Sequence, residues 1–197
     1  RAEAAIQQDD SLRLKQLFAL AVSKSGNHQL ALDSLTAIYT ANPGDSETAG
    51  ILGGIYKDLF KKHQDSKYAI LSRDTYAKNF EATGNYYTGI NAATMSAIAG
   101  RAVQGREIAA LVISELESQA NSVWELATLG EAYVLTKNRD RAVEYYIKAR
   151  KLVGNDWGKV LSIHNQLWLL NHYLPVAKEI LRIFAPPIVL AFAGHMV

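Results

Sequence analysis

This sequence contains histidines, carboxylates, lysines and tyrosines, which are side chains that could do chemistry. It contains no cysteine. Disulfides, thiolate metal ligands and thiol nucleophiles are therefore excluded. His164 and His172 lie eight residues apart, but on either side of an expected helix junction. Ordinary surface or packed histidines explain them better than a metal site does. The charged cluster Arg139, Asp140 and Arg141 is more simply a solvated turn, so we expect neither a metal nor a cofactor.

The sequence also lacks the compact motifs that carry catalysis. It has no glycine-rich phosphate loop, no His-Glu-x-x-His, no EF-hand loop, no nucleophile elbow and no protein-kinase signature. Tyr86 and Tyr87 could stack on a ligand, but aromatic residues that open a helical repeat are more often packing residues. The sequence therefore indicates a chain that is not itself an enzyme.

Composition narrows the class of protein further. The chain has 197 residues, of which 49% are hydrophobic, which is enough for an ordinary core. Its net charge is only +2, with acidic and basic residues interspersed, which argues against a dedicated nucleic-acid surface. No apolar run reaches the roughly 18 residues that a membrane span needs.

The lack of cysteine fits a reducing compartment, so we expect a cytoplasmic location. Because the first residue is Arg1 and not Met, we expect a piece of a longer protein.

The elements that would position these side chains recur along the chain. Leu129, Gly130 and Tyr133 form Leu-Gly-x-x-Tyr, followed by Ala142 and Tyr146 as Ala-x-x-x-Tyr. This is the tetratricopeptide pattern, a helix-turn-helix unit of about 34 residues. Small residues allow two antiparallel helices to approach, while the larger ones fill the space between them. We therefore expect Gly130 at a close helix–helix contact.

Other copies follow at similar spacing. Residues 52–56 repeat the motif as Leu-Gly-Gly-Ile-Tyr, and Ala19 lies 34 residues before Gly53. Ala92 and Asn165 occupy the corresponding position in two further copies. Five helical pairs then account for almost the whole chain, which predicts an all-α, right-handed tetratricopeptide-like solenoid.

The end of the sequence does not fit the repeats. Pro186 and Pro187 break the helical pattern, and the following residues read as a hydrophobic strand that ends in glycine. We expect residues 1–186 to form the helical repeat domain. Residues 187–197 would be an orphan strand-like segment that starts a truncated downstream domain, and this segment could self-associate through its exposed edge.

Two stretches resemble a known family: Gly-Ile-Tyr-Lys-Asp-x-Phe at residues 54–60 and Tyr-x-Gly-Ile-Asn-Ala at residues 87–92. They are similar to the central regulatory (TRAF-binding) region of the apoptosis signal-regulating MAP kinase kinase kinases, and to related bacterial modules. The resemblance covers roughly residues 46–185. It implies a helical-repeat scaffold that docks partners and regulates an attached effector domain. No contact residues are carried over from the family.

In stacked repeats, the first helix of each pair lines the concave face, which is the usual peptide-binding surface. The pattern places eight polar or aromatic residues near this groove: Arg13, Gln16, Lys24, Lys57, Asp58, Tyr86, Trp124 and Glu131. Their mixed charge argues against a clamp for one acidic terminus. For any single residue, a solvated face without a partner remains the simpler explanation. If the groove binds, charge reversal at Lys57 and Glu131 should weaken binding without lowering stability.

The tryptophans lie on the last two helical pairs. We expect at least two of Trp124, Trp157 and Trp168 in the core, with Trp124 the most exposed.

Three functions remain open. The first is a protein-interaction and regulatory scaffold in a larger signalling protein, which binds a partner segment or a neighbouring domain in the concave groove. The second is a non-catalytic sensor or adaptor region of an enzyme whose catalytic domain starts after Ile188. The third, nucleic-acid binding, rests only on the basic isoelectric point.

Overall fold

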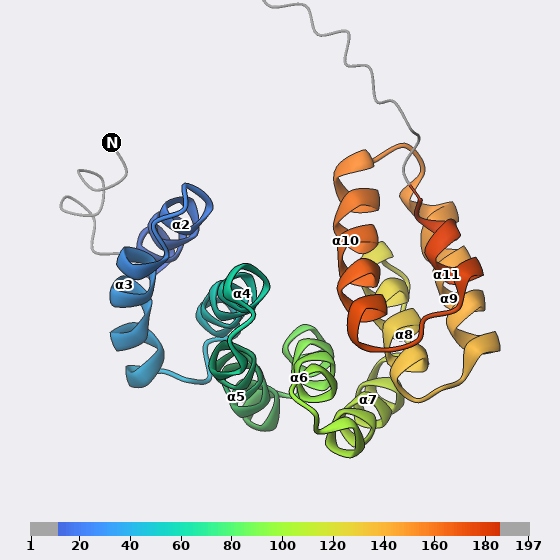
Figure 1. Ribbon diagram of the computed structural model, residues 1–197, viewed down its shortest axis with the longest axis horizontal. Helices are drawn as coiled ribbons and strands as arrows, with labels where there is room; N and C mark the ends of the chain where they lie inside the picture. Colours follow the sequence, from blue (N-terminus) through green and yellow to red (C-terminus); the bar gives the residue numbers. More distant parts are fainter. Residues whose placement is uncertain (1–11, 186–197) are drawn as a thin grey trace, which may run out of the picture.

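Ten helices follow one another in residues 12–185, the part of the chain that the computed structural model describes (Figure 1). In chain order they are α2 (Leu12–Lys24), α3 (His28–Ala41), α4 (Ser46–His63), α5 (Ser66–Thr83), α6 (Tyr86–Ile98), α7 (Ala102–Leu116), α8 (Val123–Leu135), α9 (Arg139–Val153), α10 (Trp157–Tyr173) and α11 (Lys178–Ile183). Successive helices pair and stack into an arc, with the even-numbered helices inside and the odd-numbered helices outside. The prediction of an all-α tetratricopeptide-like solenoid of about five pairs is confirmed. The strand-like segment 187–197 lies outside the described residues.

Side chains at the turns fix where the first helix of a pair begins. The Asp45 carboxylate accepts a hydrogen bond from the backbone N–H of Thr48 at 2.7 Å and so caps α4. Ser122 and Glu125 form a reciprocal capping box at the start of α8. The Glu125 carboxylate also accepts from the backbone N–H of Asn121 at 3.0 Å. These caps satisfy donors that a helix start leaves without partners, so the boundaries follow from local sequence.

Glycines allow the two helices of a pair to touch. A Cβ on Gly53 would lie 2.7 Å from the ring of Tyr76, and one on Gly130 would lie 2.8 Å from the ring of Tyr146. Both tyrosines are buried, so each ring packs directly on the backbone of the facing helix. The predicted close contact at Gly130 is confirmed.

The third pair uses a different residue at this position from the one that we predicted. Gly53 and Gly130 each stand eight residues after the N-cap of their helix, and the same count from the cap of α6 gives Ala93, not Ala92. A Cβ on Gly105 of α7 would lie 2.7 Å from the backbone oxygen of Ala93. In this pair Gly105 of the second helix therefore permits a close approach to the backbone of α6, and a Cβ on Gly89 of α6 would lie 2.8 Å from the side chain of Val112 of α7.

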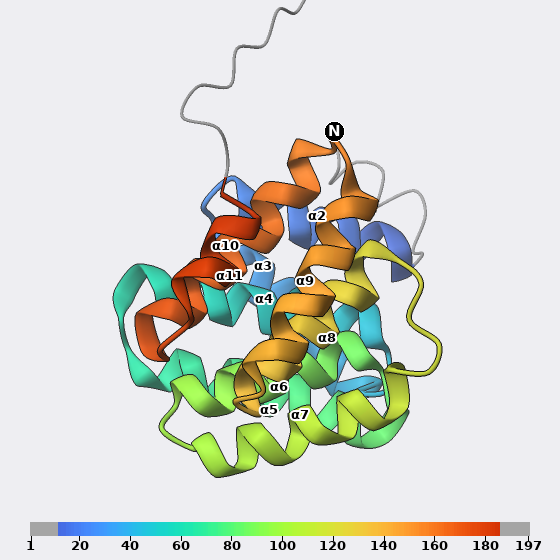
Figure 2. The same ribbon diagram turned by 90° about the vertical axis from the view of Figure 1, so that its right-hand side faces the viewer.

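The last pair departs furthest from the repeat pattern. α10 lies inside the arc and reaches α4, 109 residues earlier, where the Tyr173 hydroxyl donates to the Gln64 amide oxygen at 2.8 Å. The rings of Phe60 and Tyr173 lie 5.5 Å apart, centroid to centroid. Figure 2 looks onto α10 and α11, with the N-terminal helices behind them. Asn165, which the repeat spacing puts at the position of Gly130, is exposed and lines the larger cavity instead of a close contact between helices.

The tryptophans are less buried than expected. Trp168 is 60% exposed and Trp124 is 43% exposed, while Trp157 is partly buried against the core. Exposure of Trp124 was expected, but the prediction of two core tryptophans is wrong. The buried positions of α10 are aliphatic instead: Val160, Ile163, Leu167 and Leu170.

Two neighbouring glycines of α4 test the close contact. Gly53→Ala should destabilise the fold by about 1–3 kcal/mol, because the new methyl group overlaps the buried Tyr76 ring. Gly54→Ala is the matched control, since its Cβ would lie 3.6 Å from the Tyr76 hydroxyl, an ordinary contact. Alanine should raise stability there by up to about 1 kcal/mol through helix propensity. Urea denaturation measures both, and equal effects would contradict the contact.

Candidate functional site

The concave face is hollowed into two adjoining cavities of about 710 and 490 Å³. Side chains of α2, α4, α6 and α10 line the larger cavity, together with Tyr76 of α5. The smaller cavity lies among α4, α6, α8 and α10, with Tyr146 of α9. Four residues line both: Lys57, Tyr87, Ser162 and Gln166. Volumes of this size are typical of ligand pockets.

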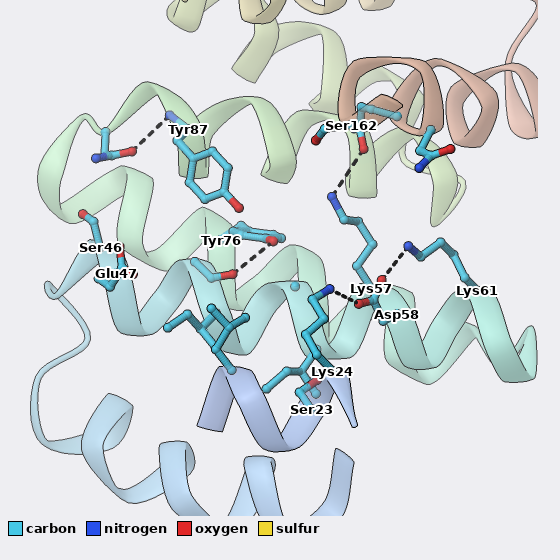
Figure 3. A pocket seen from close by; sticks show the side chains of 18 residues that line it. Ser23, Lys24, Ser46, Glu47, Lys57, Asp58, Lys61, Tyr76, Tyr87 and Ser162 are labelled. Atoms are coloured by element: carbon cyan, nitrogen blue, oxygen red, sulfur yellow. Dashed lines mark hydrogen bonds and ion pairs between the residues drawn. The ribbon is translucent and has the colours of Figure 1, made fainter. Parts of the chain in front are cut away.

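A chain of polar contacts crosses the concave face between these cavities. The Lys57 ammonium donates to the Asn91 amide oxygen at 2.8 Å and to the Gln166 amide oxygen at 3.4 Å. The Gln166 amide nitrogen in turn donates to the Glu131 carboxylate at 2.7 Å. The hydroxyl of Thr94 donates to the same carboxylate oxygen. We call these five side chains the polar bridge, and they join α4, α6, α8 and α10. Figure 3 shows Lys57 rising from α4 toward α10, where Ser162 is labelled.

Burial changes the acid–base behaviour of the two charged members of the polar bridge. It raises the pKa of Glu131, against the opposing effects of the hydrogen bonds from Thr94 and Gln166 and of the Lys57 charge. It lowers the pKa of Lys57, against the opposing charge of Glu131. Removal from water disfavours both charged forms, so each group relies on its neighbours to stay ionised.

Each of the other charged groups at the larger cavity has an ion-pair partner. The Asp58 carboxylate lies 2.5 Å from the Lys61 ammonium and 3.4 Å from the Lys24 ammonium (Figure 3). Glu47 pairs with Arg13 at 2.6 Å. Lys57 differs, because no carboxylate of the described residues lies within ion-pair distance of its ammonium.

Six of the eight residues predicted from the sequence line a cavity: Lys24, Lys57, Asp58, Tyr86, Trp124 and Glu131. Arg13 and Gln16 line neither. Gln16 is 3% exposed, and its amide donates to the carboxylate of Asp45 at 2.8 Å and to the hydroxyl of Thr48 at 3.0 Å. It therefore supports the cap of α4 and is not available to a partner.

Glu131 also differs from its expected role. It is 7% exposed and its carboxylate accepts two buried hydrogen bonds, so it belongs to the polar bridge more than to an open surface. Reversal of its charge would place an ammonium or guanidinium among these buried donors. The expectation that such a variant keeps its stability does not hold at this position.

Sequence reasoning missed Gln166, Asn91 and Ser162, although a signal exists for the first two. Polar contacts between first helices join residues about one repeat apart. Lys57 and Asn91 are separated by 34 positions, Lys24 and Asp58 by 34, and Glu131 and Gln166 by 35. A search for polar pairs at the repeat period would have found these contacts.

Helix pairing, stacking and a concave face built from first helices define a helical-repeat module of the tetratricopeptide type. Residues 1–96 match the family model described as Tetratricopeptide Repeats-Sensor (TPR-S). Among solved structures, the chain is similar to a thermophilic tetratricopeptide-repeat protein from Thermus thermophilus, with a TM-score of 0.63. The two are 14% identical, and the match covers 85% of this chain and 87% of the other, which shows a shared fold. No curated protein gives a significant match.

Two further features are absent from residues 12–185. No three or more histidine, aspartate or glutamate side chains there come together as metal ligands would. None of the described helices is both long and apolar enough to cross a membrane.

The raised pKa of Glu131 gives a stability prediction. The folded chain holds the Glu131 proton to a higher pH than the unfolded chain does, where the ordinary value is 4.5. The stability of the folded chain therefore falls as pH rises from 4.5 through the raised folded pKa of Glu131. The full loss is reached above that folded pKa. Glu131→Gln keeps an accepting oxygen but cannot titrate. Between these two pKa values, the unfolding free energy of Glu131→Gln should therefore rise relative to that of the wild type as pH increases. Urea denaturation at a series of pH values measures this difference.

Glu144→Gln provides a control of opposite sign. Hydrogen bonding from Lys148 holds the pKa of Glu144 below its ordinary value, with a further contribution from Arg141. Its contribution to stability is present above the unfolded pKa and is lost as pH falls through the folded pKa. Parallel pH profiles for the two variants would contradict the burial effect at Glu131.

Proposed function

We propose that this chain is a non-catalytic interaction and regulatory module that binds a partner segment on its concave face. The observation that carries the proposal is the convergence of the first helices of all five pairs on one hollowed surface. Tetratricopeptide folds typically mediate protein–protein contact and typically lack catalysis. The partner is a segment of another protein or of a neighbouring domain of the same chain.

The larger cavity supplies the features that a peptide segment would need. Its rim carries exposed charges of both signs, Lys24, Lys61 and Glu47. Its walls include the aromatic residues Tyr76 and Tyr87, against which a side chain of the partner could pack. A segment of mixed charge with one or two apolar anchors fits this surface better than nucleic acid does, because acidic and basic groups alternate.

A regulatory role within a larger signalling protein is the finer part of this proposal. Support comes from the resemblance of residues 54–60 and 87–92 to the regulatory region of signalling kinases. The lack of cysteine agrees with a cytoplasmic location, which we include in the proposal.

A sensor region of an enzyme is the second candidate. The matched family model carries the word "Sensor" in its name, and the cavities are partly covered by α10. In this version, occupation of the concave face would control a catalytic domain after Ile188. The segment that would lead into such a domain lies outside the described residues.

Charge reversal at the rim tests the proposed partner site. Lys24→Glu combined with Lys61→Glu should reduce capture of the partner by the full-length protein at least about tenfold, since two attractive charges become repulsive. Both lysines are exposed, and among the described residues their ammonium groups pair only with Asp58, so the fold should lose no more than about 1–2 kcal/mol. Quantitative affinity capture from source-cell lysate, with melting temperatures in parallel, provides the measurement.

Lys151→Glu is the matched control, because this lysine is exposed on α9, a second helix. Capture should stay at the wild-type level in this variant. Loss of capture in Lys151→Glu, with normal capture by the double variant, would place the partner on the outer face and refute the groove.

A further inference from the structure

One buried polar atom at the smaller cavity has no hydrogen-bond partner among residues 12–185. It is the hydroxyl of Tyr146, which is buried on a side chain that is 1% exposed. Tyr146 contributes to the lining of the 490 Å³ cavity. Buried polar groups nearly always have a partner, so an orphan beside a cavity points to a bound molecule. Burial raises the pKa of Tyr146 well above its ordinary value, which keeps the hydroxyl protonated and able to donate.

Lys57 provides a second and independent feature of the same cavity. An ammonium has three N–H donors, and the described acceptors are the amide oxygens of Asn91 and Gln166, the second at a long 3.4 Å. Within the described part of the chain, no carboxylate pairs directly with this ammonium, unlike those of Lys24 and Lys61, and the opposing charge of Glu131 acts on it only from beyond Gln166. A half-buried ammonium of this kind gains from an anion brought to it, because the interaction strengthens away from water.

Glu131 is the group that opposes an anion here, since it lines the same cavity. Its carboxylate oxygen already accepts from Thr94 and Gln166, which direct N–H and O–H dipoles toward it. The repulsion is therefore weaker than two bare charges would give.

Most of the remaining lining residues are apolar or aromatic: Tyr86, Tyr87, Ile90, Trp124, Ala127 and Ile163. The others, Asn91, Thr128, Ser162 and Gln166, carry polar side chains. Trp124 is 43% exposed although it borders a cavity, so a ligand would cover apolar surface that now faces solvent. An apolar wall with a few convergent polar groups is the usual composition of a small-molecule site.

We propose that the smaller cavity binds a small organic anion with an aromatic or apolar body. Its carboxylate or phosphate group pairs with the ammonium of Lys57, and a second acceptor of the ligand takes the hydrogen bond of the Tyr146 hydroxyl. The body lies against Trp124 and Tyr86. This site does not depend on the partner segment proposed above, and the two are tested by different measurements.

Calorimetric titration of the 197-residue chain with four probes tests the site. Phenyl phosphate and benzoate combine a ring with an anion, inorganic phosphate has only the anion, and phenol has only the ring. We expect saturable binding of phenyl phosphate or benzoate that is tighter than that of inorganic phosphate or phenol. The tighter of the two ring anions distinguishes a phosphate site from a carboxylate site. If neither ring anion binds more tightly than phenol, the anion site is refuted.

Variants at the two polar contacts locate the binding. Lys57→Met should weaken the ring anion at least about tenfold, which corresponds to about 1.4 kcal/mol. Tyr146→Phe removes only the orphan hydroxyl, so the free protein should keep or gain thermal stability while the Kd rises several-fold. This combination separates a ligand contact from a structural one.

Tyr145→Phe is the matched control. Its hydroxyl hydrogen-bonds to Glu117 at 3.0 Å, and Tyr145 does not line the cavity. This variant should lose some stability and bind the probe as the wild type does. An unchanged Kd in Tyr146→Phe would mean that only solvent contacts the hydroxyl. That result would overturn the proposed hydrogen bond from Tyr146 to the ligand. If Lys57→Met does not fold, the comparison of the two tyrosine variants decides alone.

Discussion

The crossing of α10 onto α4 determines what kind of surface the concave face presents. A row of stacked helical pairs alone would leave an open groove, whereas α10 covers part of it and divides the space into two cavities. Few described side chains join α10 to α4: Tyr173 contacts Phe60 and Gln64, and Gln166 contacts Lys57. An aromatic pair contributes about 0.5–1.5 kcal/mol and a hydrogen bond about 1 kcal/mol. The position of α10 therefore depends more on its four buried aliphatic side chains, which lie in the main hydrophobic core.

Polar contacts at the repeat period determine which concave residues remain available to other molecules. In a solenoid, equivalent positions of successive first helices face each other, so a long polar side chain meets a residue about 34 positions away. Lys24 with Asp58 and Glu131 with Gln166 are such pairs. Each contact fixes the stacking of neighbouring repeats and also occupies the groups that form it. Lys57 takes part through neutral amides, so its charge remains available.

The sequence predicts those features that local rules control. Helical pairs, the cap at Ser122 and the close contact at Gly130 follow from turn chemistry and from the size of residues between helices. Counting along the repeat also placed six of eight candidate residues at a cavity. It did not predict the burial of Gln16 and Glu131, because periodicity gives the face of a helix but not the depth to which the next repeat buries it. The crossing of α10 is a contact over 109 residues, and no repeat period encodes it.

Shared walls connect the two proposed sites. Ser162 and Gln166 of α10 line both cavities, so the position of one helix affects each of them. A molecule in the smaller cavity that contacts Gln166 or Ser162 would therefore also alter a wall of the larger cavity. A partner segment that contacts the same wall would bind more or less tightly as a result. Linkage makes this effect reciprocal, with the same coupling free energy in both directions. The two sites can be coupled in this way because one helix supplies side chains to both.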